Sequence, residues 1–188
     1  MDRNYDCLIL FSSGADSILL GEMAKEMKMK PFFLMIDYNQ LHIEELDSAT
    51  KYLQNNKNEC GWTKVKLDIV INSALTGRGE KGLYKGVSEY HVPMRNSMFL
   101  TVACSYAEAM GIPKIWIGCD FSDAIHNFLD CEQEYIIGFN EFLKVASPAN
   151  ITVEAPLLGF SKEMVVKMLD AKGIDIEKEG YSGYKQWT

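Results

Sequence analysis

Short apolar segments alternate with segments of helical periodicity along almost the whole chain, and this alternation constrains the fold more than any other feature. Uninterrupted apolar runs are typical of strands buried on both faces of a sheet. Strands that alternate with helices form parallel sheets with right-handed crossovers, so we predict an α/β fold, a doubly wound parallel sheet of about five strands with helices on both faces. The expected strands are residues 7–11, 32–36, 65–71, 115–118 and 151–155, and the expected helices are residues 18–29, 42–58, 96–110, 131–147 and 161–172.

The length of the chain favours one domain. We expect residues 1–188 to form a single unit, with a short C-terminal tail over residues 174–188. No apolar run approaches the roughly 20 residues that a membrane-spanning helix needs. The N-terminus also lacks a basic region followed by an apolar core, so we expect neither a signal peptide nor a membrane partner.

Charge and cysteine content narrow the functional class. The chain has 19 Lys and Arg residues against 26 Asp and Glu residues, a formal net charge of −7. Binding to nucleic acid depends on neutralising phosphates, so we expect small-molecule chemistry and no nucleic-acid partner. The 5 cysteines include no C-x-x-C pair, which argues against a disulfide framework and a zinc site. Free cysteines in apolar segments are typical of a reducing compartment, and we expect the protein to act in the cytoplasm.

The most informative segment follows the first predicted strand and is made mostly of small residues. In chain order these residues are Phe11, Ser12, Ser13, Gly14, Ala15, Asp16 and Ser17. Backbone N–H groups at the start of a helix, together with serine hydroxyls, form a cradle for an anion. The segment is neither a G-x-x-x-x-G-K-[ST] loop nor a G-x-G-x-x-G loop. The alternative is a plain turn in which Asp16 only caps the helix.

This segment resembles the S-G-G-x-D-S loop of the ATP-pyrophosphatase superfamily, which cleaves ATP between its α and β phosphates. Ser13 stands where the motif has its first glycine. Because a serine carries a Cβ, we expect a negative φ at Ser13 and a slightly altered loop.

Four further segments narrow the resemblance, and they follow one another in order along the chain. Residues 37–46 resemble the block D-Y-G-Q-x-H-x-x-E-L, and residues 92–100 resemble V-P-x-R-N-x-x-F-L. Residues 118–131 resemble G-x-N-x-x-D followed by P-D-C, and residues 156–163 resemble P-L followed by K-x-E. Together these blocks resemble the 7-cyano-7-deazaguanine synthase family of that superfamily, whereas no single block is specific.

The resemblance implies a fold, a reaction and cofactors. The fold is Rossmann-like, of the adenine nucleotide alpha-hydrolase type. The family converts 7-carboxy-7-deazaguanine and ammonia to the 7-cyano base, and it uses ATP and Mg²⁺. The carboxylate is adenylated, ammonia displaces AMP to give an amide, and a second adenylation followed by elimination gives the nitrile.

The resemblance also implies roles for three charged residues. Asp16 is the expected magnesium ligand. Arg95 is expected to bind a carboxylate or phosphate through two parallel hydrogen bonds. Lys162 is expected to stabilise the departing pyrophosphate. The alternative for Arg95 is a surface ion pair, which would contribute little.

The remaining expected site residues fall into two groups. ATP is expected to contact residues 11–17, with its adenine near Asp37 at the end of the second strand. The substrate is expected to contact Tyr38, Gln40, His42, Arg95, Asn96, Asp123 and Asp130. His42 has an alternative as an ordinary residue at the start of a helix, because a single histidine is weak evidence of catalysis.

The C-terminus departs from the family. The family has the segment T-W-S-C-Y followed by three more cysteines that bind zinc, but residues 180–184 of this chain read Gly-Tyr-Ser-Gly-Tyr. We therefore expect no zinc. A homodimer is expected from the resemblance and from the long apolar helix over residues 96–110. Two alternatives stay open: another amidating or sulfur-transferring enzyme of the superfamily, and a non-catalytic nucleotide-binding relative.

Overall fold

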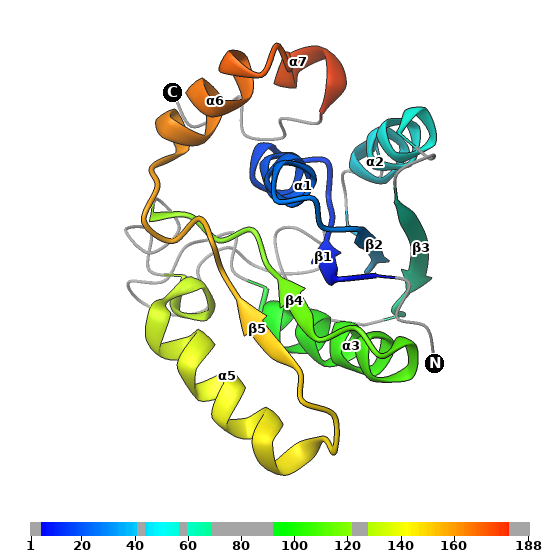
Figure 1. Ribbon diagram of the computed structural model, residues 1–188, viewed down its shortest axis with the longest axis vertical. Helices are drawn as coiled ribbons and strands as arrows, with labels where there is room; N and C mark the ends of the chain where they lie inside the picture. Colours follow the sequence, from blue (N-terminus) through cyan, green and yellow to red (C-terminus); the bar gives the residue numbers. More distant parts are fainter. Residues whose placement is uncertain (1–4, 41–43, 57–59, 69–91, 122–127, 181–188) are drawn as a thin grey trace.

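In the computed structural model, five parallel strands form one sheet in the order β3-β2-β1-β4-β5 (Figure 1). The structure describes residues 5–40, 44–56, 60–68, 92–121 and 128–180. The chain starts at the centre of the sheet, adds β2 and β3 on one side, and then adds β4 and β5 on the other. Ligands of such sheets bind where the direction of winding reverses, which here is at the carboxyl ends of β1 and β4. The strands are β1 (Cys7–Leu10), β2 (Pro31–Asp37), β3 (Gly61–Lys66), β4 (Lys114–Trp116) and β5 (Thr152–Glu154).

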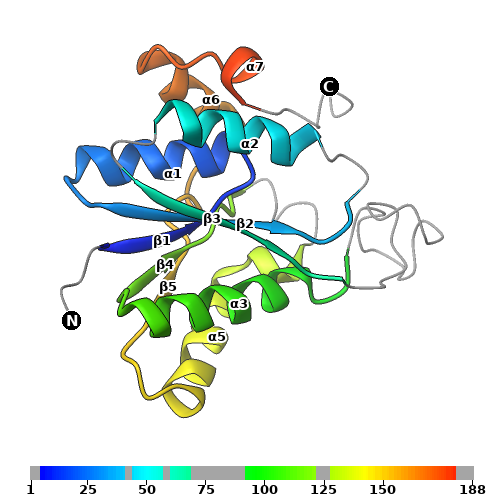
Figure 2. The same ribbon diagram turned by 90° about the vertical axis from the view of Figure 1, so that its right-hand side faces the viewer.

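Helices cover both faces of this sheet (Figures 1 and 2). One face carries α1 (Ala15–Glu26), α2 (Glu44–Asn55), α6 (Lys162–Ala171) and α7 (Ile176–Glu179). The other face carries α3 (Arg95–Met110) and α5 (Gln133–Ala146), and a short 3-10 helix, η2 (Leu129–Cys131), precedes α5. The predicted doubly wound parallel sheet is therefore confirmed. None of the helices within the described ranges has the length and apolar character needed to cross a membrane.

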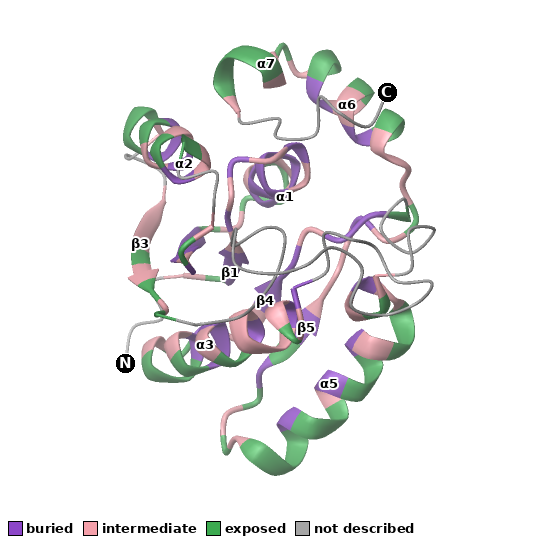
Figure 3. Ribbon diagram, turned by 180° about the vertical axis from the view of Figure 1, so that it is seen from behind, coloured by how far each residue is buried: buried purple, intermediate pink, exposed green. Residues whose placement is uncertain are grey.

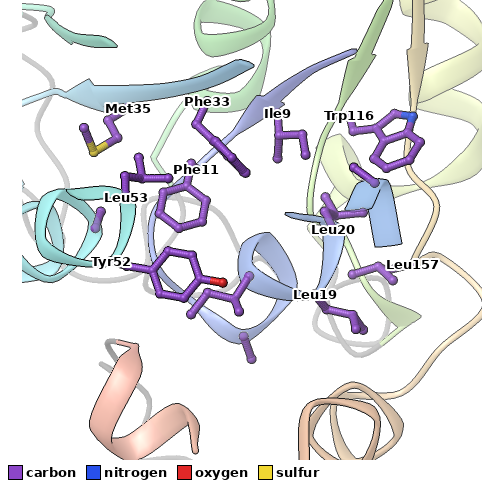
Figure 4. Close-up of a cluster of buried hydrophobic side chains, with 14 of the residues drawn as sticks. Ile9, Phe11, Leu19, Leu20, Phe33, Met35, Tyr52, Leu53, Trp116 and Leu157 are labelled. Atoms are coloured by element: carbon purple, nitrogen blue, oxygen red, sulfur yellow. The ribbon is translucent and has the colours of Figure 1, made fainter. Parts of the chain in front are cut away.

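Two hydrophobic clusters hold the helices to the sheet, one on each face. Successive residues of β1 enter opposite clusters, since Cys7 and Ile9 face α1 and α2 while Leu8 faces α3. Buried residues line the sheet and the helix surfaces that face it, whereas the outer surface of α5 is largely exposed (Figure 3). On the α1 face, Phe11 packs edge-on against Phe33 at 5.0 Å between ring centroids, and it also contacts Tyr52 (Figure 4). The segment that follows β1 therefore starts from a rigid, packed position.

Strand β5 lies at the edge of the sheet, and a side chain of α5 closes its outer side. The Asn140 side-chain amide donates to the carbonyl of Val153 at 2.8 Å, and its oxygen accepts from the N–H of Val153 at 2.8 Å. Edge strands otherwise leave such backbone groups without a partner from the sheet. Asn140 thus makes the two hydrogen bonds that a neighbouring strand would make at this position.

The predicted third strand was misplaced. We predicted residues 65–71, but the strand spans Gly61–Lys66. Strand β3 is at the other edge of the sheet, all its residues are partly buried or exposed, and its sequence contains no continuous apolar run. Helix α1 also begins at Ala15, three residues before the predicted start, because the small residues of the loop already have helical geometry. The glycine-rich segment expected to be a loop, residues 76–89, lies outside the described residues.

Burial of two thiols predicts that the folded state loses stability at high pH. Burial raises the pKa of Cys7 to about 12 and that of Cys104 to about 11, from an ordinary value of 9.0. Above pH 9 the unfolded chain releases protons that the folded chain retains, so the free energy of unfolding falls as pH rises. We expect the urea concentration at the unfolding midpoint to decrease as the pH is raised from about 8.5 to about 10.5. A Cys7→Ala, Cys104→Ala variant is expected to show a smaller decrease. An unchanged slope in that variant would contradict this assignment.

Candidate functional site

The loop between β1 and α1 is organised by its own serines. The Ser12 N–H donates to Ser17 Oγ at 3.3 Å, and the Gly14 N–H donates to Ser12 Oγ at 3.3 Å. The Ser17 hydroxyl donates in turn to the Gly14 carbonyl at 3.0 Å. Gly14 is the residue that precedes the first turn of α1, so the alternative in which Asp16 caps this helix does not apply. The serines thus hold the loop against the N-terminus of α1, beside the carboxyl end of β1, and an anion is favoured at a helix N-terminus.

The conformation of Ser13 corrects our prediction. Its φ is +62°, in the left-handed region, whereas we predicted a negative φ. A non-glycine residue there costs about 1–2 kcal/mol. Ser13 is fully buried, and its hydroxyl donates to the Glu45 carbonyl in α2 at 3.2 Å, which offsets part of that cost. The serine therefore keeps the backbone conformation that suits glycine and gains a contact to α2.

Three charged side chains from distant parts of the sequence meet beside this loop. Lys162 Nζ, at the start of α6, pairs with Asp16 Oδ2 in the first turn of α1 and lies 3.6 Å from Asp120 Oδ2. The Lys162 side chain is 42% exposed, that of Asp16 is 15% exposed and that of Asp120 is 2% exposed. The structure thus brings together two of the three predicted catalytic residues, Asp16 and Lys162, and adds a buried second carboxylate.

The backbone explains why these groups meet. The Phe121 N–H donates to the Phe160 carbonyl at 2.9 Å, which joins the segment after β4 to the segment before α6. Gly118 allows the close approach of β4 to α1, because a Cβ there would lie 3.0 Å from Asp16 Cβ. Sequence reasoning did not single out Asp120. The available signal was an aspartate directly after a buried strand, at the edge where ligands bind.

A second polar cluster lies at the start of α3. The Asn96 side-chain amide donates to the Asp130 carbonyl at 3.3 Å and to Cys131 Sγ at 3.4 Å, and Cys131 Sγ lies 3.1 Å from Cys119 Sγ. The structure therefore brings Asn96 to Asp130 through the backbone of Asp130. Arg95 is half-buried at the first position of α3, next to Asn96. Its backbone N–H donates to the Val92 carbonyl at 3.1 Å.

The other predicted site residues have varied placements. Phe11 directs its ring into the core, so only its backbone can face a ligand. After β2, Asp37 accepts from the Asn39 N–H, and Gln40 accepts from the Tyr38 N–H. The Tyr38 ring packs edge-on against Phe99 of α3 at 5.2 Å. His42 and Asp123 lie outside the described residues.

The carboxylates near the loop suit magnesium. Mg²⁺ is usually bound by one or two carboxylates, with phosphate oxygens and waters completing its shell. Asp16 and Asp120 supply two carboxylates around one cation, the Lys162 ammonium. No group of three or more His, Cys, Asp or Glu side chains is arranged to hold a metal ion within the part of the chain that the structure describes. The expected lack of zinc stays a prediction.

A charge-neutral replacement of Asp120 tests its part in this cluster. Asp120→Asn keeps the size of the side chain but removes one of two charges that attract Lys162. We expect the ATP turnover that the sequence resemblance implies to fall about 3- to 10-fold, since a partly exposed pair contributes about 1 kcal/mol. Steady-state kinetics measure this, with Asp47→Asn on the exposed side of α2 as the control. Equal rates for both variants would show that Asp120 does not influence Lys162.

The fold matches solved structures that share little sequence with this chain. The U34-tRNA thiolase NcsA from Methanococcus maripaludis superposes with a TM-score of 0.62 at 13% identity, covering 98% of this chain and 62% of that one. The NH3-dependent NAD synthetase from Campylobacter jejuni superposes with a TM-score of 0.59 at 10% identity, covering 96% of this chain and 71% of that one. Likeness at this level of identity concerns the fold, which is the predicted Rossmann-like type.

Sequence comparison is more specific. A 7-cyano-7-deazaguanine synthase from Prochlorococcus marinus is 32% identical over 197 residues, covering 98% of this chain and 88% of that protein. Another from Rickettsia felis is 32% identical over 179 residues, covering 89% and 80%. The sequence model of the family described as "Queuosine biosynthesis protein QueC" matches residues 6–187. Since this match includes the loop after β1, Arg95 and Lys162, the chain belongs to the QueC family.

Proposed function

We propose that this protein is an ATP-dependent ligase that converts 7-carboxy-7-deazaguanine and ammonia to 7-cyano-7-deazaguanine, releasing AMP and pyrophosphate. The observation that carries the proposal is the meeting of Asp16, Lys162 and Asp120 beside an anion-binding loop at the carboxyl ends of β1 and β4. The names of the curated relatives support the same reaction.

The loop binds the phosphates of ATP, and the charged cluster stabilises the charge that develops as ATP is cleaved. Backbone N–H groups of the loop and the N-terminus of α1 bind the phosphates. Asp16, with Asp120, would hold Mg²⁺, which supplies neutralisation of phosphate charge when it is bound. Lys162 leaves its carboxylate partners to contact the β phosphate, where negative charge grows as the bond to the α phosphate breaks. The adenine lies against the end of β2 near Asp37.

The acyl acceptor binds on the side of α3. Arg95 binds its carboxylate through two parallel hydrogen bonds. Asn96, which already donates to the Asp130 carbonyl, fixes the 130–131 turn that forms the wall of the base pocket. Tyr38, Gln40, His42, Asp123 and Asp130 complete that pocket. Ammonia attacks the adenylated carboxylate to give the amide, whose oxygen is adenylated in a second cycle before elimination.

Incubation with defined substrates tests the proposal. The purified protein is mixed with ATP, Mg²⁺, ammonium and 7-carboxy-7-deazaguanine, and products are identified by mass spectrometry. We expect two AMP for each nitrile formed. Amide with one AMP would restrict the reaction to its first half. AMP without either base product would indicate another acceptor, and ADP or no nucleotide product would contradict the proposal. Benzoate in place of the base serves as the control acceptor.

We further propose that the protein acts in the cytoplasm as a homodimer, on small molecules and not on nucleic acid or membranes. The acidic net charge of −7 supports the absence of a nucleic-acid partner. Light scattering at micromolar concentration is expected to give about twice the 21.3 kDa mass of the chain. A mass of one chain would contradict the dimer while leaving the proposed reaction unaffected.

A further inference from the structure

Gly180 directly follows α7 and lies close to Ser13, in the loop between β1 and α1. Its backbone is extended, with φ −114° and ψ −172°, a conformation that any residue adopts. The backbone angles therefore do not require glycine at this position. A Cβ built on Gly180 would nevertheless lie 2.7 Å from the Ser13 carbonyl oxygen, 3.1 Å from Ile18 Cδ1 and closer still to Ile176 Cδ1. The absence of a side chain at Gly180 is what allows this approach.

The contact with the Ser13 carbonyl differs from the other two. The contacts with Ile18 and Ile176 are made by terminal methyl groups, which a change of rotamer can move, although Ile18 is fully buried. A carbonyl oxygen moves only with the backbone. Ser13 is fully buried and already in the left-handed region, and its hydroxyl donates to the Glu45 carbonyl. The loop therefore has little freedom to yield to a side chain at position 180.

Movement of the Ser13 carbonyl would also move the neighbouring Gly14 N–H. The Ser13 carbonyl and the Gly14 N–H belong to one planar peptide unit, so neither can rotate without the other. The Gly14 N–H lies at the start of α1 and donates to Ser12 Oγ at 3.3 Å, one of the hydrogen bonds that organise the loop. A displacement of the Ser13 carbonyl would therefore turn this N–H and disturb that hydrogen bond.

We propose that Gly180 is a positioning residue for the loop between β1 and α1. By lacking a Cβ it lets α7 close onto Ser13, and it thereby fixes the orientation of the peptide that carries the Gly14 N–H. Both contacting positions depart from the family motifs quoted above, since the motifs have glycine at position 13 and threonine at position 180. The proposal rests on the proposed function for the identity of the ligand, but not for the contact itself.

The test compares Gly180→Ala with a glycine replacement that meets no neighbour. Gly138→Ala in α5 is the matched control, because its Cβ would have no atom within 4 Å. Hydrogen exchange of the loop peptide is measured in the ligand-free protein, and calorimetry measures the affinity for a non-hydrolysable ATP analogue. We expect Gly180→Ala to exchange its loop amides at least tenfold faster and to bind the analogue at least tenfold more weakly. Gly138→Ala is expected to match the wild type in both.

Two double variants separate the loop contact from general crowding. Ser13→Gly in the Gly180→Ala background frees the carbonyl to move and is expected to recover at least half of the lost affinity. Ile176→Ala in the same background removes only side-chain crowding and is expected to recover none. Full recovery by Ile176→Ala would overturn the proposal. If Gly180→Ala does not fold, the proposal expects Ser13→Gly to restore folding in that background and Ile176→Ala not to restore it, and the reverse result would overturn it as well.

The outcome is distinguishable from that of the proposed function. If the wild type does not bind the ATP analogue, the proposed function fails, and loop exchange in the ligand-free protein still decides the role of Gly180. If the wild type binds it and Gly180→Ala shows unchanged exchange and affinity, only the positioning role fails.

Discussion

Replacing Asp16 with alanine is expected to abolish AMP formation while leaving the fold intact. The Asp16 carboxylate lies between the loop and Lys162, in the first turn of α1. Its loss removes the expected magnesium ligand and one partner of Lys162 at once. Removing a group that stabilises developing charge typically costs about 10²–10³-fold in kcat, and we expect a loss at the upper end of that range.

Nucleotide analysis by chromatography measures this effect, and thermal unfolding checks the fold. Asp170→Ala, an exposed aspartate on α6, is the control and is expected to keep the wild-type rate. Calorimetry with a non-hydrolysable ATP analogue then separates weaker binding from slower chemistry. AMP production by Asp16→Ala at the wild-type rate would show that the loop is not the catalytic cradle.

Replacing Lys162 with alanine is expected to lower kcat by about 10²-fold or more, with a smaller change in the KM for ATP. The ammonium is proposed to contact phosphate where charge grows in the transition state, so its contribution should exceed what it provides to ground-state binding. Because the removal also takes a counter-charge from Asp16 and the buried Asp120, thermal unfolding is measured to confirm that the variant is folded at the assay temperature.

Helix α6 offers a matched control for this variant. Lys167 lies on the same helix and pairs with Glu163 on the surface, where both side chains are more than 70% exposed. Lys167→Ala is expected to leave kcat and KM unchanged. If Lys162→Ala raised the KM for ATP and left kcat intact, the lysine would only bind ATP and would not act on the leaving group.

The sequence was most informative where the chemistry of neighbouring residues determines structure. Apolar runs predicted β1, β2, β4 and β5. Of these, the inner strands β1, β2 and β4 are the ones expected to be buried on both faces of a parallel sheet. Strand β3 was misplaced because it lies at an edge of the sheet and contains only partly buried and exposed residues, so no apolar run marks it. The resemblance gave both Asp16 and Lys162 a role at the ATP phosphates, although 146 positions separate them, but it did not predict their ion pair.

Contacts between distant segments account for what the sequence did not predict. The left-handed conformation of Ser13 depends on burial and on the Glu45 carbonyl, neither of which is visible in a short motif. The place of Asp120 beside Lys162 depends on the Phe121–Phe160 hydrogen bond, which joins the segment after β4 to the segment before α6. Local preference alone cannot predict such positions, because tertiary contacts override it.

The side chain of Asn140 also limits how two copies of this chain can associate. Many proteins dimerise by aligning edge strands, so that one sheet runs through both subunits. Here a second strand would meet Val153 with its N–H and carbonyl already bonded to the Asn140 amide, and it would have to displace α5 to pair. Two copies therefore cannot share a sheet across β5 at Val153 while α5 stays in place.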